Sequence, residues 1–81
     1  MAATLSLEGV TVERDGEPVD GGPQVGAVVR YNVLRVTKRG QLLLELDGVT
    51  AVRRIDARNW AVDTASGTVH VTKVRNCGCG R

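Results

Sequence analysis

Residues 5–19 have the sequence LSLEGVTVERDGEPV, and this stretch decides the fold class. Before Gly9, leucines alternate with polar residues; after it, the apolar positions shift by one place, to Val10 and Val12. Alternation with a period of two predicts a half-buried β-strand. The change of phase at Gly9 predicts a bulge or bend within that strand.

The dipeptide Asp15-Gly16 predicts a hairpin, because both central positions of a type I′ turn need positive φ. The chain is expected to return in the antiparallel direction through residues 17–19. Pro18 places this returning strand at a sheet edge, since proline has no N–H to donate. The cluster that follows, DGGP at positions 20–23, predicts a loop over residues 20–26.

Apolar alternation and turn signals continue to the end of the chain. Further strands are predicted at 27–38, 41–46, 49–57, 59–64 and 68–75. In the second of these, Leu43 is apolar along with its neighbours, which is typical of a strand covered on both faces. Lys38-Arg39-Gly40 is expected to form the turn between the first two of these strands, and Asp47-Gly48 is a second hairpin signal. A short helix at 49–57 is the alternative there, because Val49, Val52 and Ile55 recur at helical spacing, but the flanking turn signals favour a strand.

These segments predict an all-β fold, a single small antiparallel barrel, roll or sandwich of six to seven short strands. The whole chain, residues 1–81, is expected to form one domain. Its parts are an acidic N-terminal hairpin (1–19), a loop (20–26), a basic β body (27–75) and a Cys-Gly tail (76–81). The first and last strands are expected to have free edges unless a barrel closes over them.

The expected core is made of small side chains. The chain has fourteen Val and seven Leu but no Phe, and Tyr31 and Trp60 are its only Tyr and Trp. Both aromatics stand on otherwise apolar faces and are expected in the core, with Trp60 as an interface anchor in the alternative interpretation. So small a domain commonly needs a disulfide, a metal or a partner subunit for stability, and association is the predicted solution.

Charge is strongly polarised along the chain. Residues 1–26 have a formal charge of −4 and residues 27–81 one of +6, within a total of +2. This split favours assembly of like chains, binding of a polyanion, or pairing within one chain. The predicted interaction residues are Glu13, Asp15, Glu17, Asp20, Arg30, Arg35, Lys38, Arg39, Arg53, Arg54, Arg58 and Trp60.

The tail contains the candidates for metal or redox chemistry, Cys77 and Cys79. Two thiolates form half of a tetrahedral zinc site, so a metal or redox module is an alternative, but plain thiols and no cofactor are the main expectation. The single histidine, His70, is expected on the surface. No nucleophile, base and orienting group can be assembled from the sequence, so an enzyme is not expected.

The predicted function is that of a non-enzymatic structural or protein-interaction subunit. It would assemble with itself or with a larger scaffold, a virion component or another shell or tube being one setting. A small nucleic-acid-binding barrel that uses the basic body is the alternative, with the shortage of exposed aromatic residues against it. Without a long apolar run or a secretory signal, a cytoplasmic location is expected, or incorporation into an assembly built there.

Overall fold

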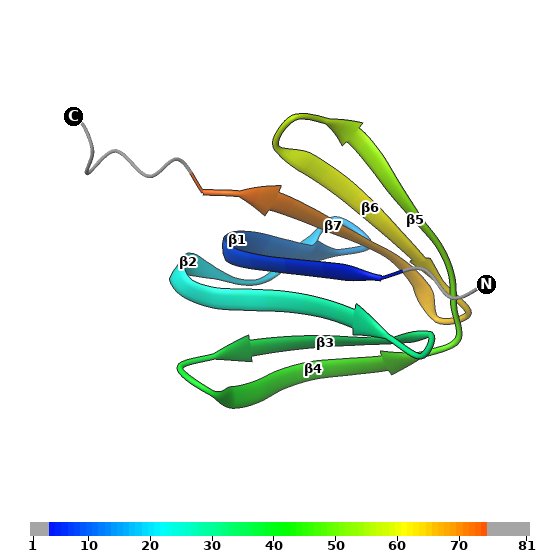
Figure 1. The fold of residues 1–81 in the computed structure, drawn as a ribbon, viewed down its shortest axis with the longest axis horizontal. Coiled ribbons are helices and arrows are strands. Elements are labelled where there is room, and N and C mark those ends of the chain that lie inside the picture. Colours follow the sequence, from blue (N-terminus) through cyan, green and yellow to red (C-terminus); the bar gives the residue numbers. More distant parts are fainter. Residues whose placement is uncertain (1–3, 75–81) are drawn as a thin grey trace.

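The computed structural model describes residues 4–74, which form seven antiparallel β-strands in one sheet (Figure 1). The all-β prediction is confirmed. Residues 49–56 form a strand, so the helical alternative for 49–57 is wrong. The strands are β1 (Leu5–Arg14), β2 (Glu17–Arg30), β3 (Val33–Lys38), β4 (Gln41–Asp47), β5 (Val49–Asp56), β6 (Asn59–Thr64) and β7 (Gly67–Lys73).

The order of strands in the sheet is β4-β3-β2-β1-β7-β6-β5. The first and last strands therefore pair with each other, through residues 10–14 of β1 and 69–73 of β7. The expectation of free edges at the first and last strands is wrong for these paired residues. The ends of the sheet are β4 and β5, which are consecutive in the chain.

The connection between β4 and β5 explains why the sheet does not close into a barrel. Every neighbouring pair in the sheet is antiparallel, so β4 and β5, six pairings apart, have the same direction within it. They could pair only as parallel strands, which need a crossover connection of about a dozen residues. Gly48 alone joins them. In Figure 1 the chain passes at this point from the β3–β4 hairpin at the bottom to the β5–β6 hairpin at the top.

Three hairpins have two-residue turns in which both residues have positive φ. These turns are Asp15-Gly16, Tyr31-Asn32 and Arg39-Gly40. The first and third were predicted from the sequence. The second was not. Residues 27–38 were predicted as one strand, which is wrong, because the turn at Tyr31-Asn32 divides them between β2 and β3.

The segment 20–26 was predicted to be a loop, which is wrong. Strand β2 runs through it and pairs with β1 on both sides of an irregularity at residues 23–25, from Glu17 to Gly22 and from Gly26 to Val29. Its glycines permit bending rather than chain reversal, and Gly22 has a φ of 143°. The bulge predicted at Gly9 is confirmed by a register shift opposite this bend. Pro18 lies where β2 has no β3 neighbour, so the predicted edge position holds locally.

The core consists mainly of valine. Strands β4 and β5 contribute least to it, with Leu46 and Val49 retaining 8% and 6% exposure. Trp60 packs against this core, as predicted. In residues 4–74, no helix is long and apolar enough to cross a membrane. The fully buried large side chains are Leu34 and Val10, Val12, Val25, Val29, Val36, Val62, Val69 and Val71.

Candidate functional site

The sheet edges β4 and β5 expose large apolar side chains. Leu42, Leu43 and Ile55 are 54%, 40% and 55% exposed. Within residues 4–74, neither strand has a neighbour on its outer side, so its outward N–H and C=O groups lack a strand partner. Free backbone groups next to exposed apolar side chains are typical of strands that pair with another chain.

Both edge strands contain an irregularity at an exposed apolar residue. The pairing of β3 with β4 skips Leu43, and the pairing of β5 with β6 skips Ile55. A bulge of this kind changes the direction of the side chain that it contains. The sequence predicted a strand covered on both faces at 41–46, which is wrong for the isolated chain. Only Leu44 and Leu46 of this strand belong to the core.

Tyr31 is exposed at the tip of the β2–β3 turn, so its predicted core position is wrong. Its side chain is 85% exposed, and its φ is 52°. A bulky residue with positive φ is uncommon and is strained relative to glycine or asparagine. The next residue, Asn32, accepts a 2.9 Å hydrogen bond from the backbone N–H of Val49. This bond ties the turn to the start of β5.

The predicted acidic residues bind partly within their own chain. Asp20 lies 3.6 Å from the Nζ of Lys38. Asp15 accepts a 3.2 Å hydrogen bond from the backbone N–H of Thr68. Glu13 is partly buried and Glu17 is exposed. The charge split was expected to serve assembly of like chains, binding of a polyanion, or pairing within one chain. The structure contains the third of these at Asp20, which pairs with Lys38.

Several predicted basic residues also have partners within the chain. Arg35 forms an ion pair of 2.6 Å with Glu45, and Arg39 donates a hydrogen bond to Gln24. The guanidinium of Arg54 lies 5.9 Å from the centre of the Trp60 ring. These contacts leave less free positive charge than the sequence suggests. Arg30, beside Tyr31, is exposed.

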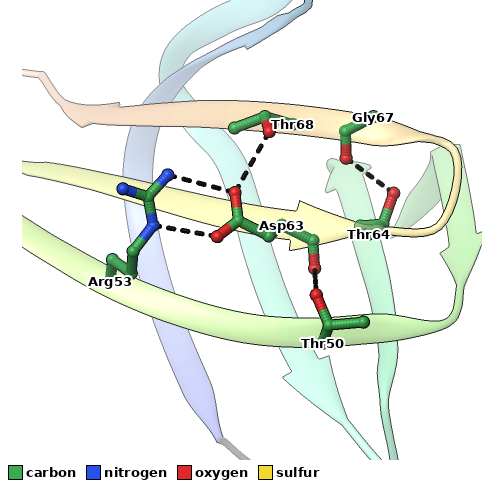
Figure 2. A network of polar contacts seen from close by, with 6 residues as sticks. All are labelled: Thr50, Arg53, Asp63, Thr64, Gly67 and Thr68. Atoms are coloured by element: carbon green, nitrogen blue, oxygen red, sulfur yellow. Dashed lines mark hydrogen bonds and ion pairs between the residues drawn. The ribbon is translucent and has the colours of Figure 1, made fainter.

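A polar network centred on Asp63 joins β5, β6 and β7 on the outer face of the sheet (Figure 2). The carboxylate accepts hydrogen bonds from Nε and Nη2 of Arg53, at 2.9 and 3.1 Å, and from the Thr68 hydroxyl at 3.0 Å. The hydrogen bonds from Arg53, and then that from Thr68, hold the pKa of Asp63 below its usual 3.8. This network fixes Arg53, one of the predicted interaction residues, beside the β5 edge.

Asp56 organises the turn between β5 and β6. Its carboxylate accepts 2.8 Å hydrogen bonds from the backbone N–H of Arg58 and from Nδ2 of Asn59. The Arg58 hydrogen bond is the main cause that lowers the pKa of Asp56. Arg58 also donates from Nη2 to the Lys73 carbonyl at 2.9 Å. Arg58 therefore connects this turn to the end of β7.

The metal and redox prediction falls on Cys77 and Cys79, which lie outside the described residues. Within residues 4–74, no three His, Cys, Asp or Glu side chains come together as a metal site. His70 is partly buried, and its Nε2 lies 3.3 Å from Oδ1 of Asn59. A fully exposed His70 is thus not what the structure has. Among the described residues, the side-chain hydrogen-bond partner of His70 is the amide of Asn59, which is not a nucleophile that His70 could activate.

The outer face of the sheet has a shallow depression of about 280 Å³ near Gly26. Glu8, Thr37 and Arg39 are among its lining residues. It exists because Gly26 has no side chain between Glu8 on β1 and Thr37 on β3, its cross-strand partners. The depression is wide open and lacks convergent buried polar groups, so it does not have the features of a small-molecule site.

Comparison with protein-family models, curated proteins and solved structures gives no match for this chain. Support for the candidate site therefore comes from the structure of this chain alone.

The sequence prediction missed the four exposed apolar residues, Tyr31, Leu42, Leu43 and Ile55. The signal was present for two of them in the unbroken run Leu42-Leu43-Leu44, which cannot all face one core from a regular strand. Ile55 and Tyr31 gave no such signal. Their exposure follows from a bulge and from a turn that was not predicted.

Proposed function

We propose that this protein is a non-enzymatic assembly subunit that associates with other copies of itself through the sheet edges β4 and β5. One observation supports the proposal above all. The sheet cannot close between these strands, and the residues exposed along the opening are Leu42, Leu43 and Ile55. Sheet edges that have no strand neighbour and expose apolar residues favour strand addition.

The composition of the core supports association as well. The interior is built from valine and contains one fully buried leucine, so its apolar content is small for a stable domain. Covering the edge side chains in an assembly would remove further apolar surface from water. This burial stabilises by about 25 cal/mol for each Å² of apolar surface. A repeated component of a shell, a tube or a virion is one setting that would suit such a subunit.

Native mass measured over a wide range of protein concentration tests the proposal. We expect oligomers that grow with concentration and a return to monomer when Leu42, Leu43 and Ile55 are all replaced by Thr. Tyr31→Ser is the matched control, since it removes an exposed apolar group that belongs to neither edge strand. A wild-type chain that stays monomeric up to millimolar concentration would overturn the proposal, as would an assembly that the triple variant leaves intact.

Nucleic-acid binding is the second candidate, and Tyr31 is the observation that favours it. Single-strand binding by β-sheets relies on exposed aromatic side chains beside basic groups, and Tyr31 is exposed next to Arg30. Fluorescence anisotropy with a labelled single-stranded oligonucleotide tests this candidate across salt concentrations. Binding that falls steeply with salt and is lost in Tyr31→Ala would support it, whereas no binding at low salt would eliminate it.

A further inference from the structure

The exposed residues of the two edges are complementary to each other. Along β4, the exposed alternate positions are Leu43, Glu45 and Asp47. Along β5, the exposed alternate positions are Arg53 and Ile55, and their neighbours Arg54 and Asp56 are exposed as well. One edge therefore offers leucine and acids, and the other offers isoleucine and a base.

An antiparallel pairing of β4 with β5 has one register that matches these groups. With Leu43 opposite Ile55, Glu45 falls opposite Arg53, because residue numbers rise along one antiparallel strand as they fall along the other. A slip of two residues places Leu43 opposite Arg53, or Glu45 opposite Ile55. A slip of one residue sets exposed positions against core-facing ones.

Of the two inward-facing pairs in the same register, Leu46 with Val52 is apolar on both strands, and Leu44 falls opposite Arg54. Leu46, which is 8% exposed and part of the core, falls opposite Val52, which packs against that core. The core of one subunit would thus continue across the junction into the next. Arg54 directs its guanidinium to the Trp60 ring, at 5.9 Å from the ring centre, and the apolar stem of an arginine can pack beside a leucine.

The charges exclude a symmetric junction as the preferred arrangement. A β4–β4 junction would bring together Glu45 and Asp47 from both copies, with no base on either strand. A β5–β5 junction would gather Arg53 and Arg54 from both copies, and the one acid of β5, Asp56, is already held by hydrogen bonds within its own turn. Like charges on adjacent strands are destabilising, so unlike edges are favoured.

We infer that β4 of one copy pairs antiparallel with β5 of the next, in the register that sets Leu43 opposite Ile55. This inference rests on the proposed function and names the partner and the contact for it. Each copy has one edge of each kind, so the junction is heterologous and repeats into a ring or a filament. The pairs Arg35–Glu45 and Arg53–Asp63 would then join into one line of alternating charge across the junction.

Disulfide trapping tests the register. In a background with Cys77→Ser and Cys79→Ser, chains with Leu43→Cys are mixed with mass-tagged chains with Ile55→Cys under mild oxidation. Directly opposite residues have Cβ atoms about 5 Å apart, close to the distance that a disulfide needs. We expect the mixed 43–55 dimer to exceed both self-linked dimers. The matched control mixes Asp47→Cys with Ile55→Cys. Residue 47 lies about 13 Å along β4 from residue 43, the position opposite Ile55, so these two cysteines are not expected to cross-link.

Charge reversal tests the direction of pairing without a cross-link. Chains with Glu45→Arg or with Arg53→Glu should each assemble several-fold more weakly than wild type, because each junction then holds two like charges. An equimolar mixture should assemble as wild type does, since each junction between unlike chains again pairs a base with an acid. Each variant loses the same internal ion pair alone and in the mixture, so that loss does not affect the comparison.

The outcomes separate this inference from the proposed function. Oligomers in native mass together with predominant 43–43 or 55–55 dimers, or with no rescue on mixing, overturn the β4–β5 pairing and leave self-assembly intact. A wild-type monomer at all concentrations overturns both. The mixed disulfide and rescue on mixing together support the inference.

Discussion

Arg53 and Asp63 face each other in a two-pronged ion pair, with the Nε–Oδ2 and Nη2–Oδ1 distances at 2.9 and 3.1 Å. Arg53 lies on the edge strand β5 and Asp63 on its inner neighbour β6. The pair holds the edge strand to the sheet at a point where β5 has no second neighbour among the described residues.

Replacing Asp63 by Asn should lower stability at neutral pH and flatten the acid limb of the stability curve. Hydrogen bonds from Arg53 hold the folded-state pKa of Asp63 below 3.8, so the carboxylate stabilises the fold while it is ionised. This contribution is complete above about pH 5 and is lost as the pH falls through the folded pKa. Urea unfolding between pH 7 and pH 3 measures it.

The matched control for this prediction is Asp47→Asn on the other edge strand. Asp47 is exposed and makes no ion pair among the described residues. Its replacement should leave the acid limb as steep as in the wild type. Equal acid dependence in the wild type and Asp63→Asn would contradict the prediction.

Gly48→Ala should destabilise the fold more than Gly16→Ala. Both glycines have positive φ, 73° and 87°, which costs an L-residue about 1–2 kcal/mol. An added Cβ at Gly16 meets no atom within 4 Å, whereas one at Gly48 lies 3.1 Å from the Cβ of Ala65. The difference between the two variants in denaturant unfolding measures the crowding at the β4–β5 connection.

A second substitution separates the two causes at Gly48. In an Ala65→Gly background the crowding partner is gone, so Gly48→Ala should cost less there than in the wild type. An unchanged cost would mean that backbone strain accounts for the whole effect.

Leu34→Ala should cost about 2–5 kcal/mol, because Leu34 is fully buried and its truncation leaves a cavity. Leu42→Ala should change stability by no more than about 0.5 kcal/mol in the monomer, since Leu42 is 54% exposed. Chemical unfolding at micromolar concentration compares the two. Equal losses would show that the edge leucine is buried in solution.

Tyr31→Asn should raise the free energy of unfolding by about 0.5–1 kcal/mol. Asparagine tolerates the positive φ of this turn position better than tyrosine does. A strained, exposed aromatic residue is typical of a functional position. A gain in stability together with a loss of oligonucleotide binding would assign Tyr31 to recognition; lower stability would show that its side chain supports the fold.

The local features of the fold were predictable where one short segment contains the whole signal. Asp15-Gly16 and Arg39-Gly40 close hairpins as predicted, since their turns depend on the φ angles of two residues. Asp47-Gly48 has the same two residue types as Asp15-Gly16, but the strands on either side of it, β4 and β5, do not pair as a hairpin. Gly48 has positive φ but Asp47 does not, so the type I′ geometry is missing.

The candidate site was less predictable because it depends on contacts between distant residues. The sequence indicated the charged members, and the structure pairs several of them within the chain, as with Asp20 and Lys38. The exposed residues Leu43 and Ile55 were missed. Their exposure depends on which strands have neighbours, and this is not visible in any window of the sequence.

By itself, the sequence determined the all-β class, the valine-rich alternation that builds the core, and the two hairpin turns named above, because these follow from side-chain periodicity and from local φ preferences. Only the tertiary structure decided which strands are edges. Pairing of β1 with β7 makes every step around the sheet antiparallel, and a single glycine then cannot bring β4 and β5 together as neighbours.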